Sequence, residues 1–288
     1  MNKKPLTTTS AQALMRFENE KIVTPLALQF LRKTRPIYLV PTGRPESEIT
    51  TIGSCFFLRF LNRAFVVTAS HVAKEAQNGI LYLTTASTIV ESAAATCIES
   101  IPSPVFHTGD WSRHEDEDEI DLAFAEIPEG RAKRFPAEAF FTMSEWDTDD
   151  RPHPQSHYLI CGWPAKRNQP NPRKVRKLPR SPISYRDASH PASYYDRHGW
   201  SRDVHYAIEF SPKRAIDGGH KLTIPPRMRG LSGSPCLFFH RYRTRDDLLA
   251  IRSPKLVGIA ISIQKDALIA TRVSVLLDLL KKHCRSSA

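Results

Sequence analysis

Short apolar segments separated by turn residues recur along this 288-residue chain. They are rich in Val, Ile, Phe and other residues that favour β-strands. The first set lies at residues 37–40, 55–60, 64–68, 80–83, 88–97 and 122–127, and the second at 157–161, 204–210, 235–239, 255–263 and 267–273. The pattern predicts an all-β protein with a hairpin turn at residues 61–63. The two sets predict two antiparallel β-barrels, the first within residues 36–150 and the second within residues 151–273.

The two ends of the chain carry helical signals. Apolar residues recur at helical spacing over 275–283, with Ser274 as a candidate N-cap and basic residues at the C-terminal end. Residues 274–288 should therefore form a closing helix and tail. Residues 1–35 are predicted to be an N-terminal arm that is only partly helical, because Pro25 interrupts its apolar pattern.

Composition narrows the class of protein. Hydrophobic residues make up 41% and charged residues 25% of the chain, as in soluble globular proteins. The positively charged start is followed by a polar stretch rather than by the apolar core of a secretory signal. No apolar run reaches the length of a membrane span. We therefore expect a soluble, cytoplasmic protein with no membrane partner.

Cysteine usage agrees with a reducing compartment. The cysteines are odd in number, far apart and without the C-x-x-C pairs of zinc sites. They are Cys55, Cys97, Cys161, Cys236 and Cys284. Cys236 is either a reactive thiol or a packed one, and the apolar residues Leu237, Phe238 and Phe239 that follow it favour the packed thiol. No metal or organic cofactor is expected.

The net charge of +11 is concentrated in one segment. Residues 165–202 carry ten Lys or Arg against two Asp. The five prolines of this segment argue against a regular helix or a central strand and favour a long surface insertion. The insertion is either a solvated loop or an electrostatic contact for nucleic acid or an acidic protein. In the second interpretation the candidate stacking or anchoring groups are Tyr185, Tyr194, Tyr195 and Trp200.

Three residues that fit one catalytic mechanism occur in the order His71, Asp121, Ser232. Their surroundings read VVTASHV, EIDLAFAEI and GLSGSP. A histidine base, a carboxylate that orients it and a serine nucleophile together activate a hydroxyl for attack on a carbonyl carbon. Asp116 and Asp118 are alternatives for the carboxylate, but only Asp121 begins a strand-like segment.

The serine motif has a physical reason for its glycines. Gly230 and Gly233 flank a tight turn that presents Ser232, and such a turn needs permissive backbone angles and unobstructed amides. The motif differs from the G-x-S-x-G elbow of α/β-hydrolases, because Ser234 takes the place of the final glycine and no helix signal follows. Ser234 is also a poor rival nucleophile.

Together these segments resemble the trypsin-like serine peptidases of the chymotrypsin fold. The resemblance is carried by Gly53-Ser54-Cys55-Phe56-Phe57, by the strand into His71, by Asp-Leu-Ala-Phe at Asp121 and by the pattern G-x-S-G-[GS]-P at residues 230–235. With Val257-Gly258-Ile259 and residues 270–274 it extends over most of the chain, from residue 37 to residue 283. The chain is more similar to the bacterial HtrA and glutamyl-endopeptidase types than to digestive enzymes, and we expect it to be a type without the PDZ domain of HtrA.

The resemblance implies a role for each motif residue. Ser232 would attack the peptide carbonyl, His71 would accept the proton and return it to the leaving amine, and Asp121 would fix the tautomer of His71. The backbone amides of Gly230 and Ser232 would form the oxyanion hole. The expected reaction is hydrolysis of peptide bonds through an acyl-enzyme, without a cofactor.

Three departures separate the chain from the digestive enzymes. Leu231 stands in place of the aspartate that pairs with a newly cut N-terminus. Val72 replaces the cysteine that would pair with Cys55, and Pro226 replaces the acid at the base of the specificity pocket. We therefore expect no zymogen activation by that ion pair, no secreted-type disulfide and no preference for Lys or Arg in the substrate.

Further substrate contacts are proposed from position alone. Arg227, near the pocket, either favours an acidic residue of the substrate or is simply exposed. Ala260, Ile261 and Ser262 are candidates for a strand that pairs with an extended substrate, and Ser262 is a candidate to support Asp121.

The sequence thus predicts a serine endopeptidase acting on proteins or peptides. The alternative is a catalytically silent peptidase fold whose groove or basic insertion holds a protein or nucleic acid. Retention of all three triad residues favours the enzyme.

Overall fold

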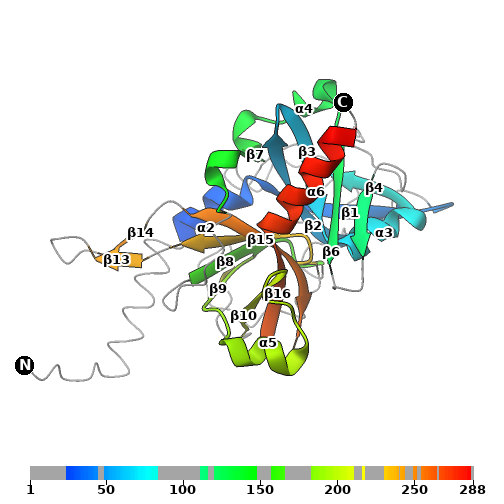
Figure 1. Ribbon diagram of the computed structural model, residues 1–288. Helices are drawn as coiled ribbons and strands as arrows, with labels where there is room; N and C mark the ends of the chain where they lie inside the picture. The colour runs from blue at the N-terminus through cyan, green and yellow to red at the C-terminus, as the bar shows by residue number, and fades with distance from the viewer. Residues whose placement is uncertain are drawn as a thin grey trace, which may run out of the picture.

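Two antiparallel β-sheets and a C-terminal helix make up the computed structural model (Figure 1). One sheet curls into a half-barrel. The first sheet uses residues 34–141 and the second residues 157–272, so the expected predominance of antiparallel β-structure and the closing helix are confirmed. The structure describes residues 24–44, 49–83, 111–115, 120–147, 157–165, 183–210, 216–217, 230–239, 241–243, 249–251, 254–264 and 266–286. The predicted strand at 88–97 lies outside them.

The first sheet has its strands in the order β4-β1-β2-β3-β6-β5, and β7 pairs in parallel with β2. The strands are β1 (Thr34–Pro41), β2 (Thr50–Phe60), β3 (Arg63–Thr68), β4 (Gly79–Leu83), β5 (Ser112–Glu115), β6 (Asp121–Ile127) and β7 (Phe140–Phe141). The predicted hairpin turn joins β2 to β3, where Leu61 and Asn62 have φ angles of 47° and 63°. Two successive left-handed residues match the twist of the strands that they connect.

The second sheet has the order β10-β16-β15-β12-β8-β9-β11. Its strands are β8 (His157–Gly162), β9 (Ile183–Asp187), β10 (His205–Glu209), β11 (Ile216–Asp217), β12 (Pro235–Phe239), β15 (Lys255–Ile263) and β16 (Ala267–Arg272). A separate ribbon, β13 (Arg241–Arg243) with β14 (Leu249–Ile251), extends away from both sheets at the left of Figure 1.

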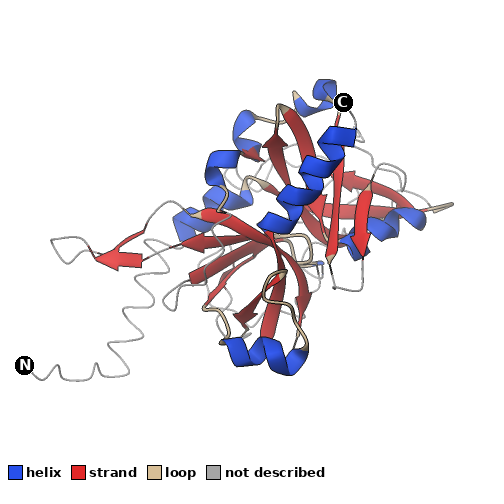
Figure 2. Ribbon diagram, in the orientation of Figure 1, coloured by secondary structure: helices blue, strands red, loops and turns tan. Residues whose placement is uncertain are grey.

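Helices are short apart from the last one and lie around the two groups of strands (Figure 2). They are α2 (Thr24–Leu31), α3 (Ser70–Lys74), α4 (Glu129–Ala132), α5 (Ala192–His198) and α6 (Val273–Ser286), with 3₁₀ turns η3 (Glu75–Gln77), η5 (Ala137–Ala139) and η6 (Met143–Glu145). Pro25 lies in the first turn of α2, where its missing amide costs nothing. Because α6 begins at Val273, Ser274 lies inside its first turn and is not the N-cap that we expected. Within the described residues no helix has both the length and the apolar character to span a bilayer.

The expectation that residues 165–202 form one surface insertion is wrong for its second part. Here β9 is an interior strand of the second sheet, between β8 and β11, and α5 follows it. The prolines permit this because Pro182 precedes β9 and Pro191 is the N-cap residue of α5. Residues 166–182, which carry most of the positive charge, lie outside the described residues.

Three aromatic residues of this segment pack against the core and are not available for stacking on a partner. Tyr194 and Tyr195 are buried, Trp200 is partly buried against the same cluster, and the Tyr195 hydroxyl accepts a hydrogen bond of 2.7 Å from the amide of Ala207. The aromatic contribution predicted for Tyr194, Tyr195 and Trp200 in nucleic-acid or protein binding is therefore wrong. Nothing is described of the Tyr185 side chain.

A shared hydrophobic core joins the two sheets. One cluster combines Phe56 and Phe124 from the first sheet, Leu237 and Ile259 from the second, and Leu276 and Leu280 from α6. In Figure 1, α6 lies across the junction of the two sheets. Burying each large side chain here contributes roughly 1.5–3 kcal/mol, so α6 stabilises both halves together.

The described cysteines behave as packed or unpaired thiols. Cys55, Cys161 and Cys236 are completely buried and form no disulfide, and burial raises the pKa of each thiol. A thiol with a raised pKa carries little nucleophilic thiolate at neutral pH. Cys236 is therefore a core residue, as the apolar residues after it predicted.

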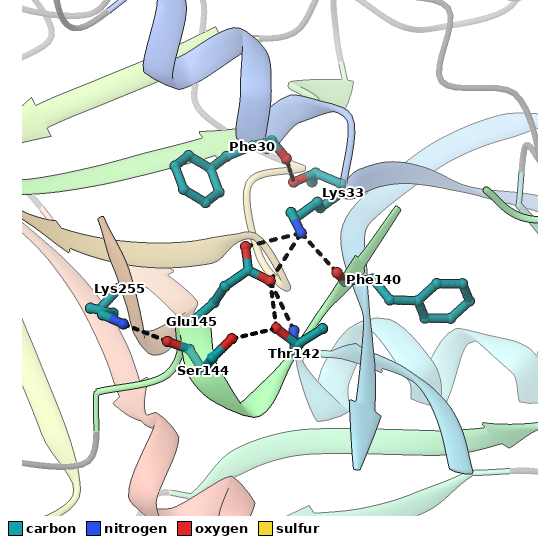
Figure 3. Close-up of polar contacts among 8 residues, drawn as sticks. Phe30, Lys33, Phe140, Thr142, Ser144, Glu145 and Lys255 are labelled. Carbon is teal, nitrogen blue, oxygen red and sulfur yellow. Dashed lines mark hydrogen bonds and ion pairs between the residues drawn. The ribbon is translucent and has the colours of Figure 1, made fainter. Parts of the chain in front are cut away.

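A buried lysine ties the end of α2 to the connection between the sheets (Figure 3). Lys33 Nζ lies 3.0 Å from Glu145 Oε1 and donates a 2.7 Å hydrogen bond to the carbonyl of Phe140. Glu145 also accepts a 2.9 Å hydrogen bond from the amide of Thr142, which closes a capping box on η6. The Lys33 side chain is 9% exposed and that of Glu145 is 27% exposed, so the ion pair is partly shielded from water.

Replacing Lys33 by methionine is expected to destabilise the fold by about 1–3 kcal/mol, because the partly buried Glu145 carboxylate then loses its cationic partner. The loss is measured as the change in the free energy of unfolding in urea. A matched control is Lys281→Met, whose ion pair with Asp278 is exposed and should contribute about 0.5 kcal/mol or less. Equal losses in the two variants would contradict the structural role of the Lys33 pair.

Candidate active site

Strand pairing brings His71 next to Asp121. His71 is the second residue of α3, which begins two residues after β3 ends at Thr68. Thr68 pairs with Ala123 of β6, and Asp121 is the first residue of that strand. The end of β3 and the start of β6 therefore meet at one place in the sheet.

The carboxylate of Asp121 contacts His71 at two atoms. Its Oδ1 accepts a 2.9 Å hydrogen bond from the backbone amide of His71, and its Oδ2 lies 2.5 Å from Nδ1 of the ring. An ionised carboxylate can only accept, so Nδ1 carries the proton and Nε2 is the basic nitrogen. The His71 side chain is 52% exposed, which leaves its ring accessible to a substrate. Asp116 and Asp118, the alternative carboxylates, lie outside the described residues.

The serine lies in a tight turn before β12. The amide of Ser234 donates a 2.9 Å hydrogen bond to the carbonyl of Leu231, which closes a four-residue turn with Ser232 at its second position. Gly233, at the third position, has a φ angle of 86°, which a type II turn requires there. Gly230 has a φ angle of 98°. Both glycines thus adopt the conformation for which the sequence predicted them.

Two backbone hydrogen bonds fix this turn to β15. The amide of Gly233 donates to the carbonyl of Ala260 at 2.7 Å, and the amide of Ala260 donates to the carbonyl of Ser234 at 2.9 Å. The Gly233 amide is therefore engaged and does not face a substrate. Among the described residues, no acceptor takes the amide of Ser232 or Gly230, the two donors that the family resemblance assigns to an oxyanion hole.

Gly53 lies close to both the serine turn and α3, the helix that carries His71. A Cβ atom on Gly53 would lie 2.6 Å from Cγ1 of Val72 and 3.3 Å from the carbonyl oxygen of Ser232. Val72 follows His71 directly, so the serine turn and α3 both lie close to the same glycine. The two sheets thereby contribute different parts of one site.

The Ser232 hydroxyl donates to the carbonyl of Ile261 at 3.3 Å. Between the described groups of His71 and Ser232 the structure has no hydrogen bond. Catalytic hydrogen bonds are often absent or long without substrate and form in the substrate complex. A rotation of the Ser232 side chain about its Cα–Cβ bond is needed to direct the hydroxyl away from Ile261.

No protein-family model matches this chain, and no curated protein is similar to it in sequence. The likeness to the trypsin-like peptidases therefore depends on the motif residues and on their arrangement. Within the described residues no group of three or more His, Cys, Asp or Glu side chains is arranged to hold a metal ion.

The structure describes only some of the residues that were predicted to contact substrate. Pro226 and Arg227 lie outside the described residues. Ala260 and Ile261 are buried in β15, and both backbone groups of Ala260 bond the serine turn, so Ala260 anchors that turn and does not offer free backbone groups to a partner strand. Ser262 pairs with Ile269 of β16, and in the described part of the chain no hydrogen bond joins it to Asp121.

Sequence reasoning missed the role of Ser54. Its amide donates a 2.9 Å hydrogen bond to the carbonyl of Ser232, and its hydroxyl donates a 2.6 Å bond to the carbonyl of Gly230. The only signal was a small hydroxyl residue before the otherwise apolar run from Cys55 to Leu58. Nothing in the order of residues indicated that its partners come from the second sheet.

Proposed function

We propose that this protein is a serine endopeptidase with a trypsin-like arrangement of two β-barrels. The observation that supports it most is the double contact of Asp121 with the amide and ring of His71, together with the approach of the serine turn, which precedes a strand of the other sheet, to the residue after His71. That arrangement provides a base of defined tautomer and a nucleophile within one small region. Proteins or peptides are the proposed substrates.

The proposed reaction proceeds in two halves. The Ser232 hydroxyl turns from Ile261 toward Nε2 of His71, which takes its proton while Oγ forms a bond to the peptide carbonyl carbon. The amides of Gly230 and Ser232 stabilise the oxyanion, and His71 returns the proton to the leaving amine as the C–N bond breaks. In the second half, His71 takes a proton from a water molecule, which attacks the acyl carbon. The bond to Ser232 Oγ then breaks, His71 returns the proton to Oγ, and the carboxylic acid is released.

A fluorophosphonate probe tests this proposal, because it forms a covalent bond only with an activated serine. We expect the wild-type protein to be labelled at Ser232 and the Ser232→Ala variant to remain unlabelled, as measured by mass spectrometry of the modified peptide. Ser234→Ala is the matched control, since Ser234 lies in the same motif but is completely buried. The Ser234→Ala variant should still be labelled at Ser232.

Absence of labelling in folded wild-type protein would overturn the enzyme proposal. It would support the alternative of a silent peptidase fold that binds a protein or nucleic acid. Labelling at any residue other than Ser232 would contradict the assignment of the nucleophile.

A further inference from the structure

We propose that Ser54 is a positioning residue that aligns the Ser232 amide with the oxyanion of the substrate. The inference rests on the proposed serine-peptidase function, and it adds a residue of the first sheet to the machinery of the second. Ser54 is completely buried in β2, where it pairs with Pro36 of β1.

Ser54 holds the backbone on both sides of the nucleophile. Its hydroxyl donates to the carbonyl of Gly230 at 2.6 Å, and its amide donates to the carbonyl of Ser232 at 2.9 Å. The peptide group that joins Leu231 to Ser232 lies between these two carbonyls and carries the Ser232 amide. With its two neighbouring peptide groups fixed, this amide has little freedom to rotate.

The direction of the Ser54 hydroxyl is determined by a third residue. The amide of Trp163, just after β8, donates a 3.0 Å hydrogen bond to Ser54 Oγ. An amide can only donate, so the hydroxyl proton must point to another acceptor, which is the Gly230 carbonyl. The Gly230 bond is thus set by the fold and not by a chance rotamer.

A fourth contact connects Ser54 to the strand that leads to His71. The hydroxyl of Thr68, the last residue of β3, donates a 2.7 Å hydrogen bond to the carbonyl of Ser54. The amide, carbonyl and hydroxyl of Ser54 are therefore all engaged, and they connect β3, the strand that leads to His71, to the serine turn. Such a connection keeps the two parts of the site in register.

Fixed donors are effective in catalysis because they need no reorganisation as charge develops on the oxygen. Loss of one oxyanion donor lowers kcat by about 10²–10³-fold in related chemistry. Ser54 acts through the Ser232 amide and does not touch substrate. Removing its hydroxyl should therefore lower kcat by about 10²-fold, near the lower end of this range. KM should stay within about twofold, because the contact matters mainly in the transition state.

The experiment compares the full-length wild type with Ser54→Ala on a peptide ester substrate. We expect Ser54→Ala to lower kcat about 10²-fold with little change in KM, and to weaken binding of a peptide aldehyde, a transition-state analogue, by a similar factor. Thr34→Ala is the matched control: it also removes a buried hydroxyl that donates to a carbonyl, at 3.1 Å to Phe30, but away from the site. It should lose comparable stability and keep its kcat.

Each result has one meaning. Unchanged kcat in Ser54→Ala, or an equal loss in Thr34→Ala, would overturn the positioning role while leaving the enzyme proposal intact. A wild type without turnover or labelling would overturn both. If Ser54→Ala fails to fold, Thr68→Val removes the hydrogen bond to the Ser54 carbonyl and keeps a side chain of similar volume. A kcat loss of about tenfold at constant KM supports the proposal, and no loss contradicts it.

Discussion

Replacing His71 by alanine is expected to lower kcat about 10⁶-fold, and Asp121→Asn about 10⁴-fold. Without the imidazole, no group in the proposed mechanism accepts the Ser232 proton. In Asp121→Asn, the amide nitrogen favours donation to Nδ1, which places the ring proton on Nε2 and removes the base. Both losses are measured as kcat on a peptide ester with purified, folded protein.

The control for these variants is Glu126→Gln on the same strand. Glu126 forms a solvent-exposed ion pair with Arg63 of β3, so its replacement should leave kcat unchanged. The double variant His71→Ala with Asp121→Asn should be no slower than His71→Ala alone, because Asp121 acts only through His71. Additive losses would contradict that dependence and would require a separate role for Asp121.

Gly233→Ala is expected to destabilise the protein by roughly 3–5 kcal/mol and to abolish labelling of Ser232. A Cβ atom at this position would lie 2.0 Å from the carbonyl oxygen of Ser54 and 2.2 Å from Oγ1 of Thr68, so the serine turn must move. The left-handed φ angle of 86° adds a further penalty for any residue with a side chain. Urea denaturation and fluorophosphonate labelling measure the two effects.

Gly199→Ala separates backbone strain from steric overlap. Gly199 ends α5 with a φ angle of 73°, but a Cβ atom there has nothing within 4 Å. Its replacement should cost about 1–2 kcal/mol and leave labelling intact. Similar losses in the two glycine variants would show that strain alone, and not the contact with Ser54, explains the need for Gly233.

Sequence patterns predicted most of the strands because each has a local signal. A short run of apolar and β-branched residues, such as those around Val66 and Ile259, can be recognised from a few neighbouring positions. The pattern failed at β9 and α5, where charge and prolines dominated the composition of residues 165–202. Proline excludes a helix or strand only at its own position and its neighbours, so a short element fits between two of them.

The sequence predicted the side chains of the candidate site, but not the hydrogen bonds that hold the serine turn in place. His71 and Asp121 each stand in a recognisable local context, and their pairing follows from the adjacency of β3 and β6. The contacts of Ser54 and Ala260 depend on how one sheet docks on the other. Hydrogen bonds between distant segments produce no recognisable pattern in the sequence. For this reason the sequence pattern predicts that Ala260 pairs with substrate, whereas it bonds the serine turn.

The division of the site between two sheets has a consequence during biosynthesis. A nascent chain acquires His71 and Asp121 first, but Ser232 follows more than one hundred residues later, and the core shared by both halves is complete only when α6 packs. Until then the base has no aligned nucleophile. In the proposed mechanism, hydrolysis therefore begins only after the two halves have docked.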